Sequence, residues 1–254
     1  MTDRPILFSA PMVKALLDGR KSQTRRIIKF PGVDKVIDFV QVATELPSGV
    51  PVFEMKDADG RHMMRPAGKD AMTPHYSPRF AKGDRLWVRE NLWLYGRWRQ
   101  EGTTPKGRPR QTLDLIGKVA AFEKPADIAY YGGKAGFAFR PGIHLPRWAS
   151  RLTLTVTDVR VERLQECSMA DAIAEGIERR STECSDGVTR ALWLGVPECG
   201  VEHAVTAYSH LWDSINNPRG LCADDAPNGW AANPWIVAVS FSVERRNIDA
   251  ARAA

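Results

Sequence analysis

Two long runs of β-branched and aromatic residues constrain the fold of this chain more than any other feature. Residues 152–161 read LTLTVTDVRV, and residues 234–243 read PWIVAVSFSV. Runs of this kind are typical of β-strands, in which successive side chains point to opposite faces. In the second run this alternation places Trp235, Val237 and Val239 on one face. The chain is therefore expected to be built around a sheet that contains both strands.

Shorter patterns predict the remaining strands and three helices. Capping residues at the start and glycine or asparagine at the end mark the helices. The predicted strands are residues 5–8, 26–30 and 85–90, and the predicted helices lie between Ser9 and Gly19, between Ser168 and Gly176, and over residues 204–215. Several strands with few short helices indicate an α+β fold. Its sheet is expected to be mixed, mostly antiparallel, and curled into a small barrel.

Three stretches interrupt these elements and are interpreted as insertions in a single domain of residues 1–245. They lie near residues 31–78, 95–140 and 178–200. The first contains an alternating piece at residues 50–55 that predicts a hairpin. The glycines and prolines of residues 96–120 predict a loop, as does the composition of residues 178–200. The last residues, 246–254, are expected to form a polar, frayed tail.

Composition limits the compartment and the partners of the chain. The 254 residues carry a net charge of +6, which favours acidic partners such as nucleic acid but also fits a solvated basic surface. The surplus is concentrated in residues 1–30, with seven basic against two acidic residues, and in residues 95–151, with eleven against four. No apolar run reaches the ~18 residues that a membrane helix needs. Nothing resembles a secretory signal, so a cytosolic protein with free thiols is expected.

The strongest candidate for a functional element is the segment GRKSQTRR at residues 19–26. Lys21 and Thr24 lie three residues apart in it, among several arginines. A lysine and a hydroxyl held together on a turn provide a base and a nucleophile. The same residues are also suited to holding a phosphate or a base, and a solvated turn lysine beside an ordinary strand threonine is the simplest alternative.

In their order and context, four segments resemble the ASCH domain, a relative of the PUA-like RNA-binding barrel. The segments are residues 17–26, 83–90, 152–176 and 235–243, which together cover less than half of the chain. The whole sequence also resembles long ASCH proteins encoded by phages and prophages. The resemblance implies a PUA-like barrel with helices at its edge and long insertions in its loops.

Some small ASCH proteins are amidohydrolases that remove acyl groups from N4-acylated cytidine. In that group a lysine accepts a proton, a threonine is the nucleophile and a glutamate donates a proton, and the matching positions here are Lys21, Thr24 and Glu175. The residues expected to bind the substrate around them are Arg20, Arg25, Arg26, His144, Arg147 and Trp148. Because this chain is much longer than those enzymes, its insertions leave the identity of the substrate open.

Two other functions stay open at this point. The first is a non-catalytic module that binds RNA or single-stranded nucleic acid, with tryptophans such as Trp98 stacking on bases beside basic residues. The second is an ASCH-type ribonuclease. His144 either lines a pocket or is an ordinary loop histidine.

Neither a metal nor a cofactor is expected. The cysteines form no C-x-x-C pair, the other histidines have no metal-ligand spacing, and the chain has no glycine-rich phosphate loop. The expected partner is therefore a modified nucleoside or a single-stranded nucleic acid, with no membrane, and the oligomeric state is left open.

Overall fold

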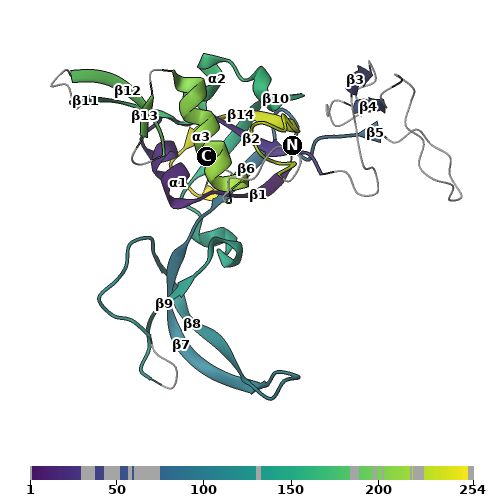
Figure 1. The fold of residues 1–254 in the computed structure, drawn as a ribbon. Coiled ribbons are helices and arrows are strands. Elements are labelled where there is room, and N and C mark those ends of the chain that lie inside the picture. The colour runs from purple at the N-terminus through teal and green to yellow at the C-terminus, as the bar shows by residue number, and fades with distance from the viewer. Residues whose placement is uncertain are drawn as a thin grey trace, which may run out of the picture. The chain divides into compact units, whose positions relative to one another are not determined.

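The computed structural model shows a mixed α+β protein that is rich in strands and has few helices (Figure 1). It describes residues 2–29, 38–42, 52–56, 59, 75–129, 133–183, 189–196, 199–201, 203–217, 219 and 226–250. The chain divides into two compact units. Unit 1 comprises Met1–Thr2, Ala15–Asp84 and Thr155–Ser242, and unit 2 comprises Asp3–Lys14, Arg85–Leu154 and Val243–Ala254. The predicted α+β class and the predicted mixed sheet are confirmed.

Five strands form one sheet in the order β1-β6-β10-β14-β2. Their bounds are β1 (Asp3–Leu7), β6 (Arg85–Arg89), β10 (Thr153–Arg163), β14 (Trp235–Glu244) and β2 (Gln23–Ile27). Strands β1 and β6 run parallel, whereas β2 and β14 run antiparallel with Thr24 opposite Val239. The predicted strands are confirmed, but β2 begins at Gln23 rather than Arg26. Pairing with β14 extends the strand into residues whose own composition is polar.

The three α-helices begin and end close to their predicted limits. They are α1 (Ala10–Leu17), α2 (Met169–Ala174) and α3 (Ala204–Asn216). Gly19 follows α1 with a φ of 74°. Ser168 caps α2 together with Asp171, as the sequence predicted. No helix in the parts of the chain that the structure describes is long and apolar enough to cross a membrane.

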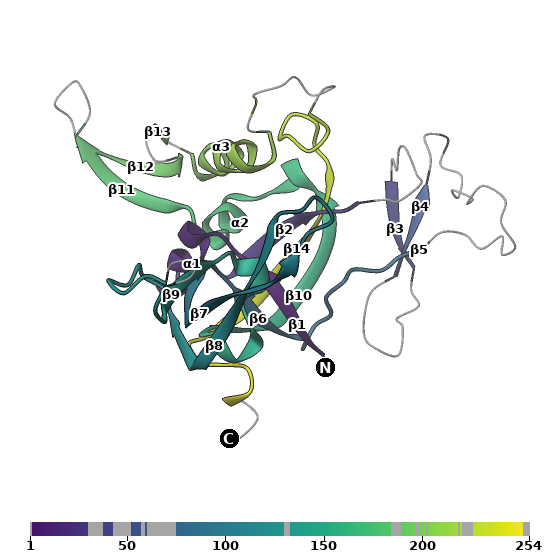
Figure 2. The ribbon, with the colours of Figure 1, turned by 90° about the horizontal axis from the view of Figure 1, so that it is seen from below.

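The core of unit 1 joins α2, α3 and β14 to a small sheet that the sequence did not predict. Strands β11 (Glu178–Glu183), β12 (Thr189–Val196) and β13 (Cys199–Val201) form an antiparallel sheet where a loop was predicted. Figure 2 shows α3 beside β12 and β13. Trp193 of β12 packs in one buried cluster with Tyr208 and Trp212 of α3. This apolar contact gives β12 a place to pack that its local composition does not reveal.

A second three-stranded sheet lies in the first predicted insertion. It consists of β3 (Asp38–Val42), β4 (Val52–Lys56) and β5 (His75–Tyr76), in the order β3-β4-β5. Strands β3 and β4 pair antiparallel, which confirms a hairpin in this region. Apart from residues 59, 77 and 78, the remainder of the predicted insertion at residues 31–78 lies outside the described residues.

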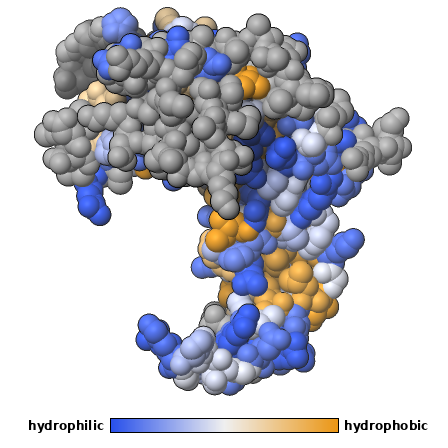
Figure 3. All heavy atoms as spheres, turned by 90° about the vertical axis from the view of Figure 1, so that its right-hand side faces the viewer, coloured by the Kyte–Doolittle hydropathy of each residue, from blue (hydrophilic) through white to orange (hydrophobic). Residues whose placement is uncertain are grey.

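Unit 2 contains a long antiparallel hairpin where residues 96–120 were predicted to be a loop. Strands β7 (Leu92–Thr103) and β8 (Pro109–Ala121) form the hairpin, and β9 (Gly136–Arg140) pairs with the other side of β7 (Figure 1). The prediction was wrong because the glycines and prolines occupy the turn and irregular register positions of one continuous hairpin. Figure 3 shows apolar surface over this sheet, whose exposed aliphatic residues are Leu115, Ile116 and Val119.

The chain end packs against unit 2 instead of forming the free tail that was predicted. Ile248 is fully buried. The Asn247 side-chain amide donates to the carbonyls of Arg147, Trp148 and Ser150, at 2.8, 3.2 and 2.8 Å. The 3-10 helix Arg147–Ala149 supplies part of this surface; a second 3-10 helix, Gly142–His144, precedes it in the chain. The polar composition of the tail reflects hydrogen bonding to unit 2; residues 251–254 lie outside the described residues.

Candidate functional site

The turn after α1 carries Lys21 to the end of α2. The backbone N–H groups of Arg20 and Lys21 both donate to the carbonyl of Ala15, at 2.9 and 3.1 Å. The N–H of Ser22 donates to the carbonyl of Ala174 at 2.8 Å. Backbone contacts on both sides of Lys21 therefore fix where its side chain begins.

Gly176 makes the close approach of these two segments feasible. Its φ is 97°, in the region that side chains disfavour. A Cβ at this position would lie 3.0 Å from the Cβ of Ala15 and 3.1 Å from the Cβ of Lys21. Any larger residue would therefore meet both backbone strain and steric conflict, beside the residue that carries the buried amine.

Lys21 and Glu175 form a buried ion pair. The Lys21 Nζ donates to Oε2 of Glu175 at 2.7 Å and to the Glu175 backbone carbonyl at 2.9 Å. The side chains are 1% and 4% exposed. Burial lowers the pKa of the Lys21 amine, although the Glu175 carboxylate opposes the shift. The positive charges of Arg26 and Arg25 lower that pKa further.

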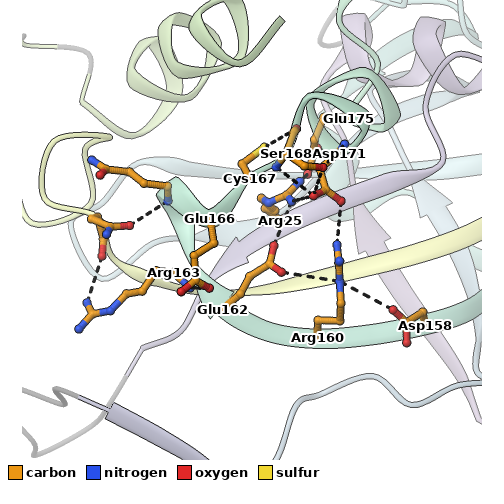
Figure 4. Close-up of polar contacts among 12 residues, drawn as sticks. Arg25, Asp158, Arg160, Glu162, Arg163, Glu166, Cys167, Ser168, Asp171 and Glu175 are labelled. Atoms are coloured by element: carbon orange, nitrogen blue, oxygen red, sulfur yellow. Dashed lines mark hydrogen bonds and ion pairs between the residues drawn. The ribbon is translucent and has the colours of Figure 1, made fainter.

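Arg25 extends this pair into a buried ionic cluster (Figure 4). Its Nη1 lies 3.3 Å from Oε1 of Glu175, and its Nη2 lies 3.0 Å from Oε1 of Glu162. A third carboxylate, that of Asp171, is 3.4 Å from Nη2. The guanidinium thus ties β2 to β10 and α2, and Glu175 is held by two cations, Lys21 and Arg25.

Asp171 connects the cluster to the cap of α2. Its carboxylate accepts hydrogen bonds from the backbone N–H of Ser168 at 3.1 Å and from Nη2 of Arg160 at 2.8 Å (Figure 4). Burial acts in the opposite direction, but these hydrogen bonds and the charge of Arg25 hold the pKa of Asp171 well below its usual range. Asp171 therefore stays ionised at neutral pH.

Two weakly acidic groups border the cluster and stay neutral. Burial raises the pKa of the Tyr208 hydroxyl well above its usual value, and a hydrogen bond with Glu175 adds to the shift. Burial also raises the pKa of the Cys167 thiol to about 12, although the charge of Arg25 opposes this. The Arg25 guanidinium lies 5.8 Å from the centre of the Tyr208 ring. A neutral thiol is a poor nucleophile, so Cys167 is unsuited to covalent chemistry.

Two buried donors on β2 lack hydrogen-bond partners among the described residues. They are Nε2 of Gln23 and Nε of Arg25. Because strand side chains alternate, Gln23 and Arg25 point to the same face of β2. Buried donors of this kind are normally satisfied, so each is available to a water or a ligand.

Of the three predicted catalytic residues, the structure brings Lys21 and Glu175 into contact. Thr24 is buried, but strand alternation points its side chain to the face of β2 opposite to Gln23 and Arg25. Within the described residues its hydroxyl makes no hydrogen bond. The Thr24 hydroxyl is thus uncommitted, but it is not in the ionic cluster.

The predicted binding residues near the turn have different environments. Arg25 lies within the ionic cluster. Arg20 donates to the carbonyl of Gly176 at 2.7 Å and pairs with Asp18 at 2.9 Å, so it braces the ends of α1 and α2. Arg26 is exposed.

The other predicted binding residues, His144, Arg147 and Trp148, belong to unit 2. His144 is exposed, and Trp148 packs against a buried cluster of unit 2. Arg147 pairs with Asp3 and with Asp249, the latter at 2.7 Å. These contacts give Arg147 and Trp148 structural roles within their own unit.

The sequence interpretation missed four residues of this site: Gln23, Glu162, Asp171 and Tyr208. Gln23 was detectable, because it lies midway between Lys21 and Arg25 at strand spacing. Asp171 was predicted only as a capping residue, and Tyr208 only as part of an apolar helix face. Glu162 gave no signal, because its partner Arg25 is 137 positions away.

No group of three or more potential metal ligands occurs in the part of the chain that the structure describes. No family model, no curated protein and no solved structure matches this chain. The ASCH resemblance therefore stays a prediction that is carried by its motif residues.

Proposed function

We propose that this chain is an ASCH-type amidohydrolase that deacylates N4-acylated cytidine or a closely related nucleoside. The buried contact between Lys21 and Glu175 carries the proposal. These two residues are separated by 154 positions, and each was assigned a catalytic role from a different motif. Arg25 adds a second cation to the same carboxylate.

The Lys21–Glu175 pair supplies a base and an acid at once. Movement of one proton across the 2.7 Å contact converts the ion pair into a neutral amine and a neutral carboxylic acid. Burial disfavours the charged form of Lys21, which brings its pKa toward the range that a general base needs. A pair of this kind removes one proton and delivers another without help from solvent.

In the proposed reaction, substrate binding brings the Thr24 hydroxyl, which strand alternation places on the other face of β2, within reach of the neutral Lys21 amine, and the amine takes its proton. The Thr24 oxygen then forms a bond to the acyl carbon. The bond from that carbon to N4 breaks, and the Glu175 carboxylic acid protonates the departing amine to release cytidine. Water hydrolyses the threonyl ester: Glu175 accepts a proton from the water, and the Lys21 ammonium returns its proton to the Thr24 oxygen.

The buried donors of β2 are suited to holding the pyrimidine. The O2 and N3 atoms of cytosine are acceptors, and Nε2 of Gln23 and Nε of Arg25 are donors without partners in the described structure. A base bound there would satisfy groups that are otherwise left unpaired, which favours binding. Gln23 is therefore proposed as a substrate-binding residue.

The test is incubation of the purified protein with N4-acetylcytidine, with release of cytidine measured by chromatography. Lys21→Met and Glu175→Gln are each expected to lower kcat by about 10²- to 10⁴-fold, the usual contribution of acid–base catalysis. Lys29→Met is the matched lysine control, since Lys29 is exposed. Release that is absent from the wild-type protein, or undiminished in Lys21→Met, would contradict the proposal.

Thr24 needs its own comparison, because strand alternation turns it away from Arg25. Thr24→Ala is compared with Ser22→Ala, which removes an exposed hydroxyl two residues away. Loss of activity in Thr24→Ala alone would support a threonine nucleophile. Full activity in Thr24→Ala, together with no activity in Lys21→Met, would instead indicate that the nucleophile is a water molecule activated by Lys21.

The proposal extends to the fold and the compartment. We propose that the sheet β1-β6-β10-β14-β2 belongs to a PUA-like barrel, as the ASCH resemblance implies, and that the protein acts in the cytosol on nucleosides. A crystal structure of the protein with cytidine would test the barrel and the position of the base together.

A further inference from the structure

The sheet β8-β7-β9 in unit 2 has two faces of different character. On β7, Leu92 and Leu94 are buried, and Ala138 of β9 is buried opposite Leu94. Trp98 also packs against this buried cluster, so it lies on the core face rather than on a binding face. The side chains that alternate with these along β7, beginning with Trp93 and Tyr95, point to the opposite side of the sheet.

Four aromatic residues form a two-by-two array on that opposite side. Trp93 lies opposite Phe139 across β7 and β9, and Tyr95 lies opposite Phe137. The ring centres are 5.4 Å apart in the first pair and 5.2 Å apart in the second, in edge-to-face geometry. Phe139 is 47% exposed, and the other three rings are half-buried. We name this surface the aromatic face.

The segment that carries the aromatic face is rich in positive charge. Residues 92–140 contain nine basic and four acidic residues, a surplus of five in a chain whose net charge is +6. Arg97 and Arg99 continue the same side of β7 beyond Tyr95, and both are exposed. Arg99 pairs with Asp114 at 2.8 Å, but both side chains are at least half exposed, so this surface pair is weak. The charge favours an anionic partner.

We propose that the aromatic face is a stacking platform for single-stranded nucleic acid. Aromatic rings beside cationic groups bind the π-faces of bases, while the cations contact phosphates. Residues on one side of a strand repeat every ~6.8 Å, which is twice the ~3.4 Å spacing of stacked bases in a duplex strand. Bases on neighbouring rings must therefore be unstacked from each other, which a single strand permits and a duplex does not.

A protein partner would use the sheet differently. Leu115, Ile116 and Val119 of β8 are exposed to nearly the same extent as Phe139, at 45–46%. Of these, Ile116 lies two residues beyond Asp114, which is paired with Arg97, so alternation places it on the same side of the sheet as the rings. An apolar protein surface would gain from burying Ile116 as well as the rings. Base stacking requires a π-system, so it depends on Phe139 and not on Ile116.

The test is a titration of a fluorescein-labelled dT12 oligonucleotide with the full chain, at 50 and 200 mM salt. The wild-type protein is expected to bind the single strand more tightly than a dA12–dT12 duplex, and more weakly at the higher salt. Phe139→Ala and Tyr95→Ala are each expected to raise Kd by about 5- to 140-fold, the usual loss for one stacked base. Ile116→Ala is the matched control, since Ile116 is 45% exposed, and it is expected to leave Kd unchanged.

Two further variants keep the test informative if an alanine variant unfolds. Phe139→Tyr retains a ring and is expected to bind as the wild type does, whereas Phe139→Leu retains apolar volume without a ring and is expected to bind weakly. Absence of single-strand binding at 50 mM salt would overturn the proposal. So would equal losses in Ile116→Ala and Phe139→Ala, or equal binding by Phe139→Leu and Phe139→Tyr, since either outcome identifies general apolar contact.

Discussion

Removal of the Glu175 charge is expected to destabilise the protein more than removal of the Lys21 charge. Glu175→Gln leaves the shape of the side chain nearly unchanged but deprives both Lys21 and Arg25 of a carboxylate. Lys21→Met removes a buried cation and leaves Glu175 in contact with Arg25 at 3.3 Å. The two substitutions therefore differ in how much uncompensated charge stays buried.

The distances set the size of this difference. At an effective dielectric constant of about 20, two unit charges 2.7 Å apart attract by about 6 kcal/mol. At 3.3 Å the attraction is about 5 kcal/mol. Desolvation cancels part of each value, and breaking one partner of a buried pair commonly costs about 3–5 kcal/mol. We expect Glu175→Gln to lose about 3–5 kcal/mol of unfolding free energy and Lys21→Met to lose no more than about 2 kcal/mol.

The pH dependence gives a sharper test than the magnitude. Burial lowers the pKa of Lys21 below its unfolded value of 10.5. Between these two pKa values the unfolded chain binds more protons, so stability rises with pH. Without the opposing charge of Glu175, the pKa of Lys21 falls further and this window starts at a lower pH. The deficit of Glu175→Gln is therefore expected to narrow as the pH rises toward the unfolded pKa of Lys21, by up to about 1.4 kcal/mol per pH unit.

Urea unfolding followed by tryptophan fluorescence at pH 7, 8 and 9 measures these free energies. The double variant Lys21→Met/Glu175→Gln lacks the Lys21 amine. The difference between its free energy of unfolding and that of Lys21→Met is therefore expected to be the same at pH 7, 8 and 9. A Glu175→Gln protein within 1 kcal/mol of the wild type at pH 7 would refute the reasoning. If the stability difference between the wild type and Glu175→Gln does not change with pH, Lys21 is not the buried charge that the substitution leaves without a partner.

Two further predictions follow from neighbouring contacts. Gly176→Ala is expected to lower the free energy of unfolding by more than about 2 kcal/mol, because it adds close contacts to the strain of a positive φ. A Cβ at Gly107 meets nothing within 4 Å, so Gly107→Ala is expected to lower it by about 1–2 kcal/mol from its φ of 74° alone. Thermal unfolding of both variants compares them. Asp171→Asn is expected to lose about 1–3 kcal/mol at pH 7 from the helix cap and the ion pairs. Because the pKa of Asp171 is lowered in the folded protein, this contribution is complete above the unfolded pKa near 4 and is lost as the pH falls below it. The control is Asp158→Asn. Asp158 is exposed and lies 3.8 Å from Arg160, so its loss is expected to change the free energy of unfolding by less than about 0.5 kcal/mol, both at pH 7 and below pH 4.

The ionic cluster also bears on how the proposed catalytic pair is maintained. Glu162 and Asp171 hold the Arg25 guanidinium, which in turn contacts Glu175. Through Arg25, Glu162 and Asp171 thus help to position the Glu175 carboxylate beside Lys21. This arrangement explains why a change in stability and a change in activity need separate measurements in every variant of the cluster.

The sequence by itself determined the elements that follow from local rules. The alternating runs at residues 152–161 and 234–243 predicted β10 and β14, because strand periodicity depends only on neighbouring residues. Ser168 and Asp171 predicted the start of α2, because a capping box is a contact between residues three positions apart. The turn that carries Lys21 was predicted in the same way, from Gly19 at the end of α1.

Local rules also caused the errors. Glycines and prolines in residues 96–120 indicated a loop, yet β7 pairs with β8 from Trp93 to Thr103 and with β9 from Leu92 to Gly96. The polar residues near the chain end indicated a free tail, yet Ile248 is fully buried. In both cases the stabilising partners come from elsewhere in the chain, so composition alone pointed to the wrong structure.

Only the tertiary structure decided which charged and aromatic side chains meet. Lys21 and Arg25 reach Glu175 across 154 and 150 positions, respectively, and the register of β7 with β9 sets Trp93 against Phe139. A sequence states which residue types are available and how they repeat along a strand or helix. Which of them become buried together depends on how the elements pack, because burial and pairing energies arise only between surfaces that the folded chain brings into contact.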